Sequence, residues 1–273
     1  MLISPEKQAE LRERYNPDGS TLREFQLRLL DILKYIDTVC QRENIPYWLT
    51  GGNVLGHVRH GGFIPWDDDI DIEIEEHDYK RLRKAILNDP DSPYQWQDHT
   101  TEGTYIMHFA KLRDLHSQVE EGWTDYYKYK GAFIDIFPMG KTSPRFIRFT
   151  TKLRALHERL IWHRLYPKSL RRLSLNLLRI WLQRCLFPLG NLFCRPFANA
   201  DKLYQTPSSV ARDFTARDRN LIFPLQRIVF EGVETNAPCH MEEILTALYG
   251  DWQTVPDPNN IHLHFDPSKI KLY

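Results

Sequence analysis

Apolar residues recur at spacings of three and four in three stretches of the chain. This period is typical of amphipathic helices and predicts them over residues 21–44, 78–87 and 238–249. The first begins with a capping box, Thr21 followed by Glu24. Each predicted helix has one apolar face available for a core.

Other stretches alternate between apolar and polar residues, as half-buried strands do. We expect strands over residues 47–50, 69–75, 105–112, 131–138 and 227–230. In the second of these, the isoleucines at 70, 72 and 74 alternate with Asp69, Asp71, Glu73 and Glu75. The acidic side chains of this strand therefore project from one face, and the isoleucines anchor the other.

A glycine turn precedes the acidic strand. Gly51, Gly52 and Asn53 lead into a short segment of helical character over residues 54–60. Glycines let the backbone N–H groups approach a ligand, and the start of a helix favours an anion such as phosphate. Asp69 and Asp71, aimed the same way beside this turn, are suited to Mg²⁺ or Mn²⁺ carrying a phosphate ligand.

Two other interpretations of the acidic stretch exist. A lone Asp-x-Asp pair is more often a solvated acidic edge strand. A calcium loop would use Asp67, Asp69 and Asp71, with Asp78 at its twelfth position, but Ile72 stands where that loop requires glycine. The isoleucine alternation also favours a strand, so we set the calcium loop aside.

A single carboxylate interrupts the predicted strand over residues 131–138. Asp135 lies between Ile134 and Ile136, and a charge in such an apolar strand requires a partner or a metal. Pairing with a nearby arginine is the structural alternative. A strand, a glycine turn, a helix, an Asp-x-Asp strand and a third carboxylate on a later strand together indicate the active edge of a nucleotidyltransferase-type sheet.

Residues 141–195 differ from the rest of the chain, since they hold thirteen Lys or Arg residues and one acidic residue, Glu158. Leucines and aromatic residues are interleaved with the cations, which predicts basic amphipathic helices broken at Pro167 and Pro188. Such helices suit an anionic membrane face. A helical subdomain with a solvated basic face is the main alternative, and nucleic-acid binding is disfavoured.

Composition places the chain among soluble globular proteins, with 273 residues, 42% hydrophobic residues and a net charge of zero. We expect a catalytic core over residues 1–140 and a helical region over 141–273, whose C-terminal part packs back on the core. The four cysteines are scattered, which favours reduced thiols in the cytoplasm over a disulfide framework or a zinc site. No signal peptide and no transmembrane run of ~18 apolar residues is expected.

Three segments resemble the LicD family, which contains bacterial phosphocholine transferases and, more distantly, fukutin and fukutin-related proteins. They are the run from Tyr47 to Ile72, the strand Gly131–Pro138 and the segment Leu248–Trp252. The resemblance extends from about Thr21 to His264, apart from the basic segment. It implies an α+β fold of the nucleotidyltransferase (polymerase-beta) type, a mixed sheet flanked by helices, with an added basic helical region.

The resemblance also implies an activity. Members transfer a phospho-alcohol such as phosphocholine from a CDP-linked donor to a hydroxyl of a cell-surface glycan or glycolipid, lipopolysaccharide included, and release CMP. By the family pattern Asp69, Asp71 and Asp135 are the catalytic and metal-binding carboxylates, for Mg²⁺ or Mn²⁺, with Asp67 as an additional ligand. The expected contacts to the donor phosphates are Gly51, Gly52, Asn53, Arg59 and His60, and less strongly Lys111 and Arg113. Many members carry Gly-Thr where this chain has Gly52-Asn53, so the phosphate contacts differ in detail.

Two rival functions stay open at this point. An Asp-x-Asp glycosyltransferase would use a nucleotide-sugar, although such folds place a nucleotide-binding βα run well before the acidic pair. A catalytically silent, membrane-associated scaffold would not need the three carboxylates. The alcohol is not determined: a choline site requires an aromatic cage, for which the chain offers Trp48, Trp66, Trp123, Tyr126 and Tyr127. We expect a cytoplasmic protein, peripheral on the inner membrane face, that acts on a glycan or a lipid-linked glycan.

Overall fold

The computed structural model describes residues 2–105, 107, 109–120, 127–162, 177–178, 180–205, 216–257, 261 and 267–273. The chain divides into two compact units. The first contains Met1–Phe137 together with Asn220–Tyr273, and the second contains Pro138–Arg219.

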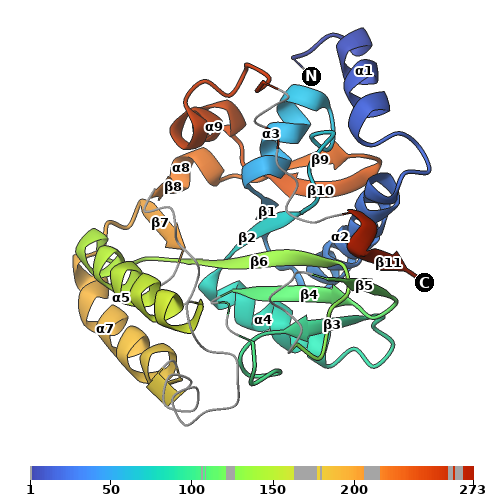
Figure 1. The fold of residues 1–273 in the computed structure, drawn as a ribbon. Helices are drawn as coiled ribbons and strands as arrows, with labels where there is room; N and C mark the ends of the chain where they lie inside the picture. The colour runs from blue at the N-terminus through green and yellow to red at the C-terminus, as the bar shows by residue number, and fades with distance from the viewer. Residues whose placement is uncertain are drawn as a thin grey trace. The chain divides into compact units, whose positions relative to one another are not determined.

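The first unit alternates helices with short strands (Figure 1). Its N-terminal part contains α1 (Pro5–Tyr15), α2 (Thr21–Glu43), β1 (Tyr47–Leu49), α3 (Gly51–His60), β2 (Asp71–Glu75), α4 (Glu76–Leu87), β3 (Tyr94–Gln97), β4 (Ala110–Asp114), β5 (Ser117–Val119) and most of β6 (Phe133–Gly140), which continues into the second unit. Its C-terminal part contains β9 (Gln226–Phe230), β10 (Val233–Ala237), α9 (Met241–Tyr249) and β11 (Ile270–Leu272). The short helix α8 (Arg219–Ile222) stands at the boundary between the two units.

The central sheet of this unit has the strand order β1-β2-β6-β4-β3. The pairs β1–β2, β4–β6 and β3–β4 are antiparallel, with Trp48 opposite Glu73 and Lys111 opposite Asp135. The Asp135 N–H donates to the carbonyl of Ile70 at 3.0 Å, which joins β6 to the start of β2. The sheet thus brings the acidic strand and the later Asp135 strand side by side.

The two faces of the sheet differ in chemistry. Ile72, Ile74, Ile134, Ile136 and Leu112 are fully buried on one face and belong to a core that includes residues of α2 and α4. The alternation of side chains along each strand sends Asp71, Asp135 and Lys111 to the other face. One face therefore holds the sheet in the core, while the other presents the charged groups.

The second unit is a helical layer joined to a small strand ladder. It contains α5 (Pro144–Trp162), a π-helical turn η1 (Leu182–Leu186), α7 (Phe187–Cys194) and the 3₁₀ turn η2 (Arg195–Phe197). Helices α5 and α7 lie side by side (Figure 1). Strand β7 (Lys202–Gln205) pairs with the end of β6 and with β8 (Arg217–Asp218).

The α+β class and the predicted long helices are confirmed. The chain has helices at α2, α4 and α9, and α3 begins at Gly51 itself rather than after the glycines. The strand predicted over 105–112 is instead β4 at Ala110–Asp114, and β3, β5 and β10 were not predicted. These three strands are only three to five residues long, which is too short for a clear period.

Two further differences concern helices. The charged N-terminal residues form α1, for which no helix was predicted. The Ser4 side chain caps this helix and Pro5 begins it. These are local signals of a helix start, but the amphipathic pattern that follows them is weak. Pro188 does not break its helix. It lies in the first turn of α7, directly after the π-helical turn η1, a geometry that accommodates its missing N–H. Pro167 lies outside the described residues.

None of the helices in the described residues is both long and apolar enough to cross a membrane.

Candidate active site

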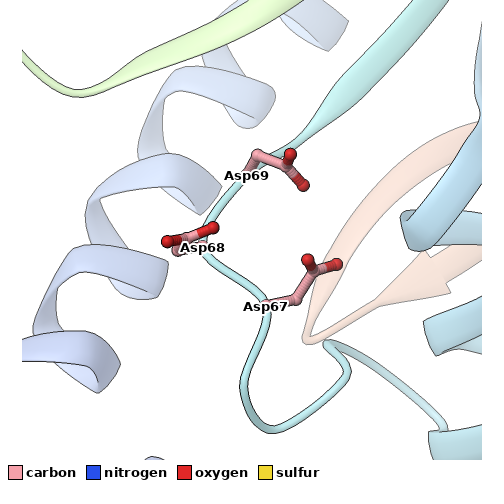
Figure 2. Close-up of side chains that lie close together, drawn as sticks. All are labelled: Asp67, Asp68 and Asp69. Atoms are coloured by element: carbon pink, nitrogen blue, oxygen red, sulfur yellow. The ribbon is translucent and has the colours of Figure 1, made fainter. Parts of the chain in front are cut away.

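The acidic residues gather where the chain leaves α3 and enters β2. One carboxylate oxygen each of Asp67, Asp68 and Asp69 lies within 4.8 Å of those of the other two. Figure 2 shows the carboxylates of Asp67 and Asp69 extending to the same side of the loop, while that of Asp68 lies on the side of the neighbouring helix. Asp67 and Asp69 are partly exposed and Asp68 is buried. The first two are therefore accessible to a ligand.

The glycines that open α3 lie directly against these carboxylates. Gly51 has φ +57°, a conformation that L side chains rarely adopt, and a Cβ atom there would lie 3.8 Å from Asp71 Oδ2. A Cβ atom on Gly52 would lie 2.9 Å from Asp67 Oδ2, too close for a real side chain. The N–H groups of both glycines belong to the first helical turn, which has no intrahelical acceptors for them. The positive end of α3 thus faces the acidic cluster.

Two buried amide side chains hold the backbone of the acidic stretch. The Asn53 side chain donates from Nδ2 to the carbonyl of Asp69 at 3.0 Å and accepts from the N–H of Asp71 at 2.6 Å. Gln26 of α2 donates from Nε2 to the carbonyl of Asp67 at 2.8 Å. The Asn53 N–H also donates to the carbonyl of Thr50 at 3.2 Å. These bonds make Asn53 a clamp on β2, with both its side chain and its N–H engaged within the fold.

Asp135 joins the site from the adjacent strand. Its Oδ1 accepts from Lys111 Nζ at 2.7 Å, a cross-strand ion pair between opposite residues of β6 and β4. The Lys111 ammonium is almost fully buried and lies 3.3 Å from the centre of the Phe133 ring. Lys111 therefore fixes the carboxylate of Asp135.

Electrostatics tie the four carboxylates into one cluster. Burial raises the pKa of Asp71 well above its ordinary value, and the charges of Asp69, Asp135 and Asp67 raise it further, while Lys111 lowers it. Each of these carboxylates is thus close enough to affect the protonation of Asp71. A hard divalent cation with oxygen ligands would relieve this repulsion, so the donor set fits Mg²⁺ or Mn²⁺.

Arg59 and His60 lie at the other end of α3. Arg59 Nη1 donates to the carbonyls of Trp252 at 2.8 Å and Thr254 at 3.1 Å, and its Nε donates to His60 Nε2 at 2.9 Å. Both residues are only 3% exposed. Arg59 and His60 were expected to contact the donor phosphates. The structure instead places both residues in the packing of α3 against the C-terminal segment.

His60 is held in a neutral state. Its Nε2 accepts from Arg59, so Nδ1 carries the proton and donates to Gln8 Oε1 at 2.8 Å. Burial, with a smaller contribution from the charge of Arg59, lowers the pKa of His60 to about 3. A neutral, hydrogen-bonded imidazole of this kind supports the fold.

Arg113 has partners of its own within the fold. It is fully buried, its Nε donates to Gln97 Oε1 at 2.8 Å, and its Nη1 donates to the carbonyl of Gly131 at 2.8 Å. Its neighbour on the same face of β4, Lys111, contacts Asp135 instead. The ion pair to Asp135 comes from Lys111.

The aromatic candidates have separate partners. Trp48 donates to Glu73 at 2.9 Å and packs on Phe223, whereas Trp66 contacts the rings of Tyr15 and His60. The buried Tyr127 packs on Tyr105. Trp123 and Tyr126 lie outside the described residues. No cage formed jointly by Trp48 and Trp66 is visible among their described ring contacts.

Three residues near the site were not predicted from the sequence. They are Asp68, Gln26 and Tyr249. The hydroxyl of Tyr249 would lie 3.5 Å from a Cβ atom at Gly51, so α9 contacts the start of α3. Gln26 had a usable signal, since it is a polar residue next to Phe25 on the buried side of α2. Tyr249 lies in the segment Leu248–Trp252 that resembles the family, but its contact with Gly51 depends on the tertiary fold.

Comparison with known proteins gives a consistent pattern. A family model described as LicD/FKTN/FKRP, nucleotidyltransferase domain, matches residues 44–181. The chain is 39% identical over 121 residues to the lipopolysaccharide cholinephosphotransferase LicD of Haemophilus influenzae, which is 43% of each protein. It is 42% identical over 93 residues to the human ribitol 5-phosphate transferase FKRP, which is 32% of this chain and 19% of that protein.

A third relative, an uncharacterized protein of Rickettsia prowazekii, is 40% identical over 60 residues, or 22% of this chain and 23% of that protein. Each match thus spans less than half of the relative's length. The family model covers the glycine turn, the acidic loop and Asp135.

Proposed function

The chain belongs to the LicD/FKTN/FKRP nucleotidyltransferase-domain family, and from this premise we propose that it transfers a phospho-alcohol from a CDP-linked donor to a hydroxyl of a glycan, releasing CMP. The observation that carries the proposal is the convergence of Asp67, Asp69, Asp71 and Asp135 beside the N-terminus of α3. The activities by which two relatives are named, transfer of cholinephosphate and of ribitol 5-phosphate, support it.

Donor binding is assigned to the N-terminal end of α3 and the carboxylates beside it. Asp69 and Asp71, with Asp135 and Asp67, would hold Mg²⁺ or Mn²⁺. The bound ion would supply charge neutralisation for the donor pyrophosphate. The N–H groups of Gly51 and Gly52 would donate to a phosphate oxygen, as the start of a helix does for anions. Asn53 keeps β2 in the position that this arrangement requires.

The chemical step is a substitution at phosphorus. The acceptor hydroxyl oxygen forms a bond to the phosphorus that carries the alcohol, and the bond from that phosphorus to the bridging oxygen breaks. The bridging oxygen keeps the bonding electrons and leaves on CMP. The hydroxyl proton passes to a carboxylate, for which we propose Asp135, since Lys111 holds it beside the cluster at 2.7 Å.

Asp135 has a structural alternative, because its pairing with Lys111 would also satisfy a charge in the sheet without any catalytic role. The two roles differ in their consequences. Asp135→Asn keeps the shape and the contact with Lys111, so a structural role predicts little change in turnover. A catalytic role, as base or as metal ligand, predicts a loss of turnover in a folded protein.

The acceptor and the place of action are also proposals. The Haemophilus influenzae relative is named a lipopolysaccharide cholinephosphotransferase, so a glycan or lipid-linked glycan made at the cytoplasmic membrane face is the acceptor class we expect. A glycosyltransferase or a silent scaffold finds no specific support in the site. Both are kept as outcomes of the experiment.

The test is an assay of CMP release with a panel of donors, each with and without Mg²⁺. The panel contains CDP-choline, CDP-ethanolamine, CDP-glycerol, CDP-ribitol and UDP-glucose, together with a deacylated glycan acceptor extract. Metal-dependent CMP release from one CDP-alcohol supports the proposal and identifies the alcohol. UDP release from UDP-glucose would establish glycosyl transfer instead. Failure of all donors to bind in parallel calorimetric titrations would favour the scaffold.

A further inference from the structure

The second unit exposes a row of large apolar side chains. Leu177, Trp181, Leu189, Phe193 and Phe197 follow one another at multiples of four residues, from the helical residues before η1 to the end of η2. Side chains four residues apart are neighbours on the surface of a helix. Their exposed fractions lie between 52% and 81%. We call these five residues the apolar row.

The apolar row is not needed for packing within the unit. Helices α5 and α7 already share a buried seam, in which the Phe146 ring lies so close to Gly190 that a Cβ atom there would be 2.5 Å from it. Ile147, Leu182 and Phe187 are buried in this unit. The row therefore lies outside the seam and remains on the surface of the described residues.

The neighbouring helix adds apolar groups of the same kind. Phe149 and Leu156, seven residues apart on one side of α5, are 54% and 56% exposed. Between and beside them stand exposed cations, namely Arg145, Arg148 and Lys152. The exposed surface of α5 thus alternates apolar and cationic side chains, as helices that lie in a membrane interface do.

Charge decides what kind of partner fits this surface. Residues 141–195 carry thirteen Lys or Arg residues and one acidic residue. In the part of the chain that the structure describes, no ion pair joins Arg145, Arg148 or Lys152 to a carboxylate. A second copy of this strongly cationic surface would be repelled, whereas an anionic surface would be attracted.

We propose that the apolar row, with Phe149 and Leu156, is a docking surface for an anionic lipid bilayer. The apolar side chains enter the boundary between headgroups and acyl chains, and the Arg and Lys side chains contact lipid phosphates. A lipid surface satisfies both features of this face at once, since it offers apolar depth beneath a negative layer. This proposal goes beyond the transfer reaction and is tested without any donor or acceptor.

The experiment measures sedimentation of the whole protein with vesicles of phosphatidylcholine, with or without phosphatidylglycerol. Two variants probe the two features: F193E/F197E places charges in the apolar row, and R145Q/R148Q/K152Q removes cations from α5. The control is L115E, at a leucine of the first unit that is 49% exposed. Thermal unfolding confirms that each variant is folded.

We expect binding to vesicles that contain phosphatidylglycerol, weakened by salt. F193E/F197E should lower the vesicle affinity at least about tenfold, R145Q/R148Q/K152Q should lower it by a similar factor, and L115E should leave it unchanged. Brominated acyl chains should quench wild-type fluorescence more than that of W181F, because Trp181 enters the bilayer.

Several results would overturn the proposal. One is a folded wild-type protein that does not sediment with either vesicle, and another is unchanged binding of F193E/F197E. A third is a wild-type dimer in light scattering that F193E/F197E dissociates without any vesicle binding, which would make this face an interface between copies. Equal binding to both vesicle types would also contradict the role of the cations.

Discussion

The two ends of helix α3 carry similar expectations from the sequence but have different surroundings in the structure. At the N-terminal end, Gly51 and Gly52 lie against partly exposed carboxylates. At the C-terminal end, Arg59 and His60 are buried and bonded to the C-terminal segment and to α1. The glycine-rich start of this helix is open to a ligand, whereas the polar residues at its end are buried and hydrogen-bonded within the protein.

This difference separates residues that are expected to take part in the reaction from residues that stabilise the fold. Burial, together with repulsion from the neighbouring carboxylates, raises the pKa of Asp71 at the N-terminal end, so this end gains from an added cation. Charges at the C-terminal end are already satisfied by hydrogen bonds within the protein. Substitutions at the first end should therefore change activity at constant stability, and those at the second should change stability at constant activity.

The largest effect is expected at Asp71. Asp71→Asn, and likewise Asp69→Asn, should lower CMP release at least about a thousandfold, because each removes a charge that would hold the metal. The melting temperature should stay the same or rise, since the substitution relieves repulsion among the carboxylates. Calorimetry and a CMP-release assay measure both quantities. Turnover like that of the wild type would exclude a metal-binding role for the residue.

A smaller loss is expected at Gly52. In Gly52→Ala the new methyl group would occupy a point 2.9 Å from Asp67 Oδ2 and displace that carboxylate. Activity should fall about ten- to hundredfold, the size expected when a group near the reacting atoms is misplaced. The control is Gly103→Ala, where a Cβ atom would meet nothing within 4 Å. Equal activity of the two alanine variants would show that the position of the Asp67 carboxylate does not matter for the reaction.

The opposite pattern is expected at Arg59. Arg59→Ala leaves the carbonyls of Trp252 and Thr254 without their donor, so the free energy of unfolding should fall by about 3 kcal/mol. Activity per folded molecule should be unchanged in cold, stabilised conditions. Urea denaturation and an active-site-normalised assay separate the two. A raised KM for the donor in a fully folded variant would indicate that Arg59 contacts the donor phosphates.

The smallest effect concerns the pH dependence of stability. The folded-state pKa of His60 is about 3, below its ordinary value of 6.5. Between these values the unfolded chain binds a proton that the folded protein does not, so acidification through this window favours unfolding and neutral pH favours folding. His60→Gln cannot titrate.

The free energy of unfolding of His60→Gln should therefore fall less than that of the wild type as the pH decreases from about 6.5 to about 4. Denaturation midpoints at several pH values provide the comparison. Parallel pH profiles of the two proteins would mean that His60 is not held neutral by its surroundings.

Sequence alone predicted the parts of the fold that have long, regular patterns. The helix α2 and the alternation of Ile70, Ile72 and Ile74 were recognisable because each repeats a period several times. Strand β3 is four residues long, and its place at the sheet edge depends on pairing with β4. Such pairing is tertiary information that no local pattern contains.

The candidate site could likewise be predicted from the sequence only where the pattern is local. The Asp-x-Asp spacing and the glycine turn predicted that Asp69, Asp71 and Gly51 would be neighbours, because strand alternation and chain reversal are local. The hydrogen bonds that clamp Asn53 to the acidic stretch and the burial of Arg59 depend on contacts between distant parts of the chain. A charged side chain in the sequence does not reveal whether its partner is a ligand or the protein's own backbone.

The most direct test of the comparison is a calorimetric titration of a CDP-alcohol in the presence of Mg²⁺ into the wild type, Asp71→Asn and Arg59→Lys. We predict metal-dependent donor binding to the wild type and to folded Arg59→Lys, and its loss in Asp71→Asn at unchanged stability. Retained metal-dependent binding in Asp71→Asn, or its loss in a fully folded Arg59→Lys, would contradict the assignment of the site to the N-terminal end of α3.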